Sequence, residues 1–127
     1  MSVVDEIIAA RVFGVVHCGL ASAHALTTAE LAREFGLRND QGCYREIDEA
    51  SARESVLRLL HRDMAYHAEV MPLEQAAGLA DRFFEPFGEG ARYFTNNWCP
   101  VTKATFDEGV LVLGLQRSGC LWVEDED

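Results

Sequence analysis

Basic residues are scarce in this chain of 127 residues, which holds 11 Lys and Arg against 21 Asp and Glu. The formal net charge is −10, of which the acidic run at positions 124–127 supplies only a part. A field of this sign repels phosphate backbones and speeds the capture of basic proteins. We therefore expect no nucleic acid as a partner and a basic protein instead, although acidity also serves solubility alone.

No apolar run is long enough to cross a bilayer, because the least charged segment, residues 12–26, is only fifteen residues long. Asp5 and Glu6 precede it, where a secretory signal would carry positive charge. These features predict a cytoplasmic protein without a membrane contact. Residues 12–26 then read as a buried apolar helix that continues the helical pattern of residues 3–13, either as one long helix or as two short ones.

Paired cysteines are also lacking. Cys18, Cys43, Cys99 and Cys120 are scattered and form no C-x-x-C motif, which excludes a zinc ribbon and a dithiol redox motif. Four free thiols in a reducing compartment are the simplest expectation. The tripeptide Trp98-Cys99-Pro100 resembles the start of thioredoxin-type active sites, which implies a reactive Cys99, but the second cysteine is missing. A packed loop cysteine is the alternative.

Catalytic motifs are absent as well: the chain has no G-x-S-x-G, no Walker-type glycine loop and no H-E-x-x-H. His61 and His67 stand six positions apart, which is the wrong spacing for one metal on a helix face. We therefore expect no metal, no cofactor and no enzymatic activity. A small ligand-binding or hydrolytic domain using His61, Asp63 and His67, with Glu69 beside them, is kept as an alternative.

The composition is that of an ordinary globular protein, with 49% hydrophobic residues, and the length fits a single domain over residues 1–127. Capping boxes at Thr27 and Ser51 and a helix start at Pro72 predict helices over residues 27–36, 51–70 and 72–87. Four strand patterns follow at residues 91–96, 101–106, 109–115 and 120–124, with turns at 107–109 and 116–119. The pattern predicts an α+β fold whose N-terminal helices pack on one face of a small C-terminal antiparallel sheet, with residues 110–113 in its centre.

Residues 27–47 resemble the helix-turn-helix pattern of bacterial DNA-binding regulators, with Ala32 and Gly36 at family-like spacing. The resemblance implies a recognition helix that begins near Asn39 and enters a DNA groove. Asp40 and Gly42 fall within that helix, and the surrounding arginines are few for phosphate contacts. A transcriptional regulator is therefore a second alternative.

The preferred interpretation is a protein-binding surface on the C-terminal strands. Aromatic and acidic residues would meet there: Tyr93, Trp98 and Trp122 as anchors, and Asp107, Glu108, Glu124, Asp125, Glu126 and Asp127 as an acidic rim. Burial in the core is the competing interpretation for Trp122, whose neighbours are apolar. We predict a non-enzymatic acidic module of bacterial type, in the form of an immunity or antitoxin-like inhibitor that fills the positive cleft of a basic toxin. Strand order and oligomeric state do not follow from these patterns.

Overall fold

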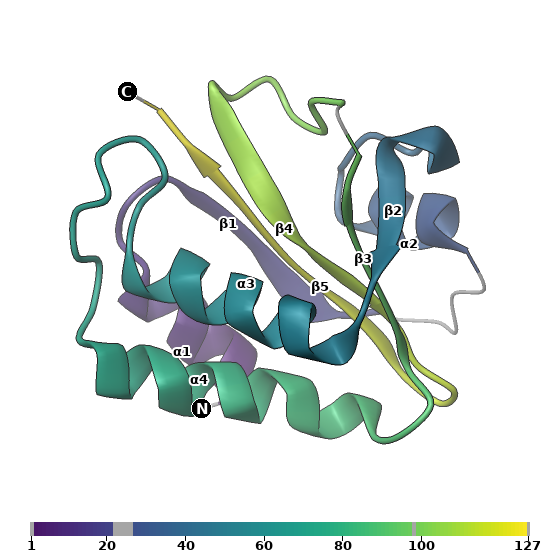
Figure 1. Cartoon of the computed structure of the whole chain (residues 1–127), viewed down its shortest axis with the longest axis horizontal. Helices are drawn as coiled ribbons and strands as arrows, with labels where there is room; N and C mark the ends of the chain where they lie inside the picture. Colours follow the sequence, from purple (N-terminus) through teal and green to yellow (C-terminus); the bar gives the residue numbers. More distant parts are fainter. Residues whose placement is uncertain (1, 22–26, 98, 127) are drawn as a thin grey trace.

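The computed structural model describes residues 2–21, 27–97 and 99–126, and it confirms the mixed α+β class (Figure 1). An antiparallel sheet with the strand order β1-β5-β4-β3-β2 forms its centre. Its strands are β1 (Val15–Leu20), β2 (Tyr44–Ile47), β3 (Arg92–Asn96), β4 (Phe106–Leu113) and β5 (Ser118–Asp125). The helices are α1 (Val3–Ala10), α2 (Thr28–Glu34), α3 (Glu49–His61) and α4 (Leu73–Phe84). Within these described ranges, no helix is long and apolar enough to cross a membrane.

Helices α1, α3 and α4 lie together on one face of the sheet, and α2 lies on the other (Figure 1). Successive side chains of a strand point to opposite faces. Val110 and Val112 of β4 therefore join the core with α3 and α4, whereas Leu111 packs with Leu31 of α2. The sheet is thus apolar on both faces along β4 and β5.

Strand β4 occupies the middle of the sheet, and residues 110–112 are fully buried, as their uninterrupted apolar run predicts. Gly109 marks a close approach between β4 and β5. A Cβ atom built on Gly109 would lie 2.2 Å from the carbonyl oxygen of Leu121 and 2.6 Å from the Cα of Trp122. Glycine is required at this position because the neighbouring strand leaves no room for a side chain. The tight turn expected at residues 107–109 is wrong, since these residues belong to β4.

The helix starts follow local side-chain chemistry. Thr27 caps α2 as predicted, because its Oγ1 accepts a hydrogen bond from the amide of Glu30 at 3.2 Å. For α3 the cap is Asp48 and not Ser51: the carboxylate of Asp48 accepts from the amide of Ser51 at 2.7 Å. This hydrogen bond holds the pKa of Asp48 below its usual value. The helix consequently begins earlier than its apolar stripe indicates, and it ends at His61.

Two segments predicted from apolar runs adopt other structures. Residues 15–20 form the edge strand β1, where a helix was expected, because they pair along β5 from Val15 opposite Glu124 to Leu20 opposite Gly119. Residues 101–105 are bends and not a strand, because the carboxylate of Asp107 ties down their backbone amides. Part of the expectation for residues 12–26 falls on residues 22–26, which lie outside the described residues.

The helix-turn-helix prediction for residues 27–47 is wrong. Helix α2 is followed by a 3-10 turn at Gln41–Cys43 and then by strand β2, which pairs with β3. Asp40 caps the 3-10 turn by accepting from the amide of Gly42 at 3.0 Å. The segment expected to read DNA is thus a strand at the edge of the sheet, so this alternative is set aside.

The expectation of four free thiols is also wrong, because Cys43 and Cys99 form a disulfide with their Cα atoms 5.3 Å apart. The partners are 56 positions apart in the sequence. Tertiary structure brings them together where the amide of Asn97 donates to the carbonyl oxygen of Cys43 at 2.7 Å. Cys99 is therefore bonded to Cys43 and is not the reactive free thiol that the thioredoxin resemblance implies. Cys18 and Cys120 are free.

Candidate functional site

A buried ion pair organises the end of the molecule at which α1 and β5 finish. The guanidinium of Arg11 donates to both carboxylate oxygens of Asp125 at 3.0 Å, and the two side chains are 0% and 3% exposed. Arg11 also donates to the carbonyl oxygens of Leu59 and Phe13, at 2.7 and 2.6 Å. Asp125 accepts a further hydrogen bond from the amide of Met64 at 2.9 Å. One ion pair thus fixes three segments against β5.

Residues 61–70, which we call the 61–70 loop, fold back on themselves at this end. Asp63 is buried, and its two carboxylate oxygens accept from the amides of Tyr66 and Ala68 at 3.1 and 2.6 Å. The amide of Val70 donates to the carbonyl oxygen of His61 at 2.7 Å and closes the loop. Because these contacts fix the backbone, the loop presents Tyr66 and His67 to solvent in a set position.

His67 adopts a left-handed backbone conformation with φ of 55°, which is uncommon for a residue with a side chain. Its carbonyl oxygen accepts from Arg62 at 2.8 Å, within the loop that Asp63 holds. Backbone strain of this kind persists only where the surrounding contacts impose it, and it concentrates at functional sites.

The first hollow beside this loop, here called the acidic hollow, has a volume of about 380 Å³. Carboxylates and aromatic rings dominate its lining, and the described residues place no basic side chain there: Phe13, Gly14, Val15, Asp63, Tyr66, Ala68, Glu124, Asp125 and Glu126. Phe13, Val15 and Tyr66 are 49%, 53% and 69% exposed. A cluster of exposed apolar side chains with charged side chains around it is typical of interaction surfaces.

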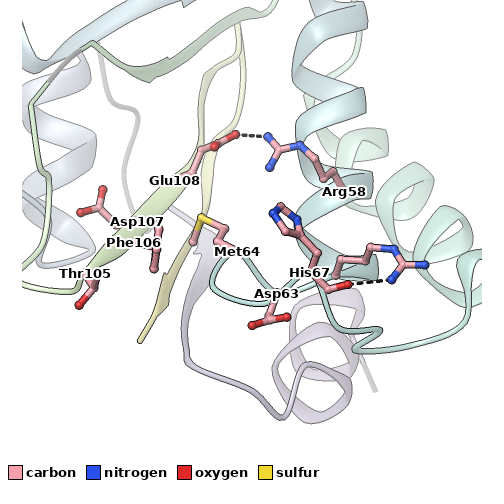
Figure 2. A pocket seen from close by; sticks show the side chains of 9 residues that line it. Arg58, Asp63, Met64, His67, Thr105, Phe106, Asp107 and Glu108 are labelled. Atoms are coloured by element: carbon pink, nitrogen blue, oxygen red, sulfur yellow. Dashed lines mark hydrogen bonds and ion pairs between the residues drawn. The ribbon is translucent and has the colours of Figure 1, made fainter. Parts of the chain in front are cut away.

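The second hollow, here called the histidine cleft, has a volume of about 440 Å³ and lies between α3 and the first residues of β4; Asp63 lines both hollows. Figure 2 shows the ring of His67 and the guanidinium of Arg58 facing the cleft, with Met64 between α3 and β4. Arg58 forms an ion pair with Glu108 across its mouth (Figure 2). Side chains of both signs line this cleft, in contrast to the acidic hollow.

The histidine cleft does not assemble the hydrolytic group predicted from the sequence. The Nδ1 of His61 lies 2.9 Å from the carbonyl oxygen of Met71, away from the cleft lining. Asp63 and His67 do line the cleft, but both oxygens of Asp63 are occupied by backbone amides. A general base must reach the group that it deprotonates. Of the three residues, His67 is thus the one left with its ring facing the cleft.

Three of the predicted binding residues are buried, and their assignment to an exposed surface is wrong. Tyr93 is 5% exposed, Trp122 is fully buried and Asp125 is 2% exposed. Trp122 lies on the sheet face that α2 covers, with its ring edge-on to Tyr44 and its Nε1 donating to Asp107 at 3.2 Å. The alternative interpretation of Trp122 as a core residue is therefore confirmed. Trp98 lies outside the described residues.

The other predicted acidic residues have internal partners. Asp107 accepts from the amides of Val101 and Thr102, at 3.2 and 3.1 Å, and so shapes the 99–105 segment. Glu108 pairs with Arg58. Glu124 contacts the Nε2 of His17 and also lines the acidic hollow. Of the predicted rim, Glu124, Glu126 and the buried Asp125 thus reach the acidic hollow, while Asp107 and Glu108 line the histidine cleft. Asp127 lies outside the described residues.

Sequence analysis did not single out Phe13, Val15 or Tyr66 as binding residues, although all three line the acidic hollow. Phe13 and Val15 sit in an apolar run that reads as core, and Tyr66 continues the pattern of a helix that in fact ends at His61. What these residues share is an exposed side chain. The periodicity of apolar residues does not reveal that exposure when the segment is assigned to the wrong helix or strand.

The described residues contain no group of three His, Cys, Asp or Glu side chains arranged to hold a metal ion. Comparisons with protein-family models, with curated proteins and with solved structures found no match to this chain.

Proposed function

We propose that this chain is a non-enzymatic module that binds a basic protein through the acidic hollow and the exposed apolar side chains around it. The observation that carries the proposal is the lining of that hollow, which combines Phe13 and Tyr66 with carboxylates and, among the described residues, holds no basic side chain. Large aromatic residues supply much of the binding free energy at protein interfaces.

The charge of the chain supports the same partner class. A net charge of −10 raises the rate at which a basic protein is captured, and an acidic rim orients it on approach. The charges of the rim determine the association rate and its dependence on salt. The aromatic side chains determine the dissociation rate.

We further propose that the partner is a basic toxin and that the chain acts as an immunity or antitoxin-like inhibitor. A toxin that acts on nucleic acid needs a positive cleft for phosphates. An acidic surface with protruding aromatic side chains is complementary to such a cleft, because the carboxylates replace the phosphates and the rings exclude water.

A small-ligand-binding domain is the second candidate, and the left-handed His67 over the histidine cleft favours it. A ligand that used this cleft would contact His67 and Arg58, so the variant His67→Gly would relieve the backbone strain but remove the ring. Loss of a ligand-induced rise in melting temperature in that variant would support this candidate over protein binding.

The proposed function is tested by capture of proteins at low salt from a lysate of the source organism, followed by elution at high salt and mass spectrometry. The variants Phe13→Ser and Tyr66→Ser remove exposed apolar surface at the acidic hollow without changing the charge. Leu115→Ser is the matched control, because Leu115 is 73% exposed in the β4–β5 turn, far from the hollow. We expect one basic protein to be retained by the wild type and by Leu115→Ser, to be lost from both hollow variants, and to be released by salt.

The captured protein is then purified and its activity is measured with and without the chain. Inhibition by the wild type, and weaker inhibition by Tyr66→Ser, is the expected result. Equal retention of the basic protein by all variants, or retention of acidic and basic proteins alike, would refute the assignment of this surface.

A further inference from the structure

We propose that the acidic hollow receives an arginine side chain of the basic partner, with the guanidinium held between carboxylates and an aromatic ring. This inference rests on the proposed function, since it specifies the chemical group that the partner inserts. The acidic hollow, at about 380 Å³, is roomy enough to take a single long side chain.

The walls and floor of the hollow are fixed before a partner arrives. Asp125 is held by the buried guanidinium of Arg11, and Asp63 is held by the amides of Tyr66 and Ala68. The charge of Asp125 is therefore balanced, which leaves Asp63, Glu124 and Glu126 as the negative groups of the lining. A preformed site lowers the entropy cost of binding.

The carboxylates nearest to solvent belong to Glu124 and Glu126. Glu124 contacts His17, and Glu126 accepts from the hydroxyl of Thr105 at 2.5 Å. Carboxylates can accept several hydrogen bonds, so both retain acceptor capacity for a cation. A guanidinium that reached them would form charge-assisted hydrogen bonds, which are stronger than neutral ones.

The aromatic residues of the lining select a flat cation. The rings of Phe13 and Tyr66 carry negative faces that attract a cation placed above them. A guanidinium stacks on such a ring while its edge donates to a carboxylate, whereas a lysine ammonium is a more strongly hydrated point charge without that geometry. The same combination of ring and carboxylate therefore favours arginine over lysine.

This chain uses the arrangement twice within its own fold. The guanidinium of Arg53 lies 4.7 Å from the ring centroid of Phe84 while its Nε donates to Glu49 at 2.8 Å. The guanidinium of Arg92 lies 5.2 Å from the ring centroid of Phe94 while it donates to Glu46 at 2.9 Å.

In both cases one arginine lies against one aromatic ring and pairs with at least one carboxylate; Arg53 pairs with Asp81 as well as Glu49. The acidic hollow contains the ring and the carboxylates, but no arginine side chain enters its lining among the described residues. The buried Arg11 is not in the lining, and its guanidinium donates to Asp125 and to the backbone carbonyl oxygens of Leu59 and Phe13. A partner's arginine would complete the arrangement.

The test is a titration of the ¹⁵N-labelled protein with short Gly/Ser peptides that carry one central arginine, followed through amide chemical shifts. The peptide with citrulline in place of arginine keeps the shape and removes the charge, and the peptide with lysine keeps the charge and changes the geometry. We expect saturable shifts at residues 13–15, 66–68 and 124–126 with the arginine peptide, no saturable shifts with citrulline, and at least about threefold weaker binding with lysine.

Variants separate the two kinds of contact. Tyr66→Leu keeps an apolar side chain but removes the ring, and we expect about two- to fivefold weaker binding of the arginine peptide. Glu126→Gln removes one charge and should weaken binding most at low salt. Glu89→Gln is the control for net charge, because Glu89 is exposed in the turn before β3, distant from the hollow. Retained dispersion of the amide spectrum shows that each variant is folded.

Equal binding of the citrulline peptide, equal binding of the lysine peptide, or shifts centred on Arg58 and Glu108 in the histidine cleft would each overturn the arginine assignment. The two proposals fail separately. If the arginine peptide does not bind, but capture of a basic protein still depends on Tyr66, the proposed function stands and this inference falls. If the peptide binds and no basic protein is captured, the arginine site stands and the proposed function falls.

Discussion

Arg11 and Asp125 are 114 positions apart in the sequence and form a two-pronged ion pair that is closed to solvent. Arg11 comes directly after α1, and Asp125 ends β5, so the pair joins the first helix to the last strand. It also supports the floor of the acidic hollow. Its loss should therefore affect both stability and the proposed binding site.

Replacing Arg11 with Met should lower the free energy of unfolding by about 3 to 5 kcal/mol, because a buried carboxylate loses its partner. Chemical denaturation of the wild type and the variant measures this difference. Arg82→Met is the control, since Arg82 forms an exposed pair with Glu6 and its removal should change stability little. If replacing Arg11 lowered the free energy of unfolding as little as replacing Arg82, the Arg11 pair would not be buried in solution.

Gly109→Ala should destabilise the protein by about 1 to 3 kcal/mol, because the added methyl group meets the backbone of β5. Gly78→Ala is the matched control: nothing lies within 4 Å of the Cβ built on Gly78, in the middle of α4. There the change should be neutral or stabilising by up to about 1 kcal/mol, since alanine is the better helix former. Thermal unfolding of both variants measures these changes in stability. If Gly109→Ala left the stability unchanged, the β4–β5 register would be contradicted.

The Cys43–Cys99 disulfide should be present in protein purified without reductant. Alkylation of the denatured chain before reduction should then label Cys18 and Cys120 only, and all four cysteines after reduction, as read by mass spectrometry. Because the bridge spans 56 positions, its reduction should lower stability by about 4 kcal/mol in the chain-entropy model.

The double variant Cys43→Ser with Cys99→Ser should be insensitive to reductant. Labelling of all four cysteines before reduction would contradict the pairing. The same alkylation performed in intact cells of the source tests the cytoplasmic prediction, since disulfides persist mainly in oxidising compartments.

Stability should fall in alkaline solution because two free thiols are shielded from solvent, Cys120 fully and Cys18 in part. Burial raises the pKa of Cys18 from 9.0 to about 12, and burial also raises the pKa of Cys120. Below pH 9 the thiol of Cys18 is protonated in both the folded and the unfolded chain, so its contribution to stability is fully present. Between pH 9 and pH 12 the unfolded chain releases the proton and the folded chain keeps it, so stability is lost over this window.

The variant Cys18→Ala should show a smaller loss of stability than the wild type between about pH 8 and about pH 10.5, measured by urea denaturation. Comparison of the two slopes removes the contribution of other groups that titrate in the same range. Equal slopes would mean that Cys18 is solvated in the folded protein.

The elements with strong local signals were predictable. Thr27 caps α2 and the apolar stripe of α3 faces the core, as periodicity and capping chemistry predict. The run of residues 110–113 identified the central strand, because a strand without polar side chains must be covered on both faces. Residues 15–20 were predicted as a helix and form a strand. A short apolar run indicates burial, but it does not distinguish a helix from a strand that forms its hydrogen bonds with a neighbour such as β5.

The acidic character of the candidate site was predictable, and its location was predictable only in part. Net charge and the lack of catalytic motifs, both visible in the sequence, favour a binding role for an acidic surface. Which acids are exposed depends on pairing between distant segments: Asp107 is taken up by amides of the 99–105 segment, and Asp125 by Arg11. Sequence alone ranked Trp122 among the anchors, whereas α2 covers it.

The sequence by itself determined the class of the fold, the central position of β4 and the sign of the surface charge, because propensity, apolar patterning and composition are local or additive properties. Tertiary structure decided the disulfide, the burial of Trp122 and the meeting of Phe13, Tyr66 and Glu124 around one hollow. Those outcomes depend on contacts between residues far apart in the chain, and no local pattern records which distant segment will supply the partner.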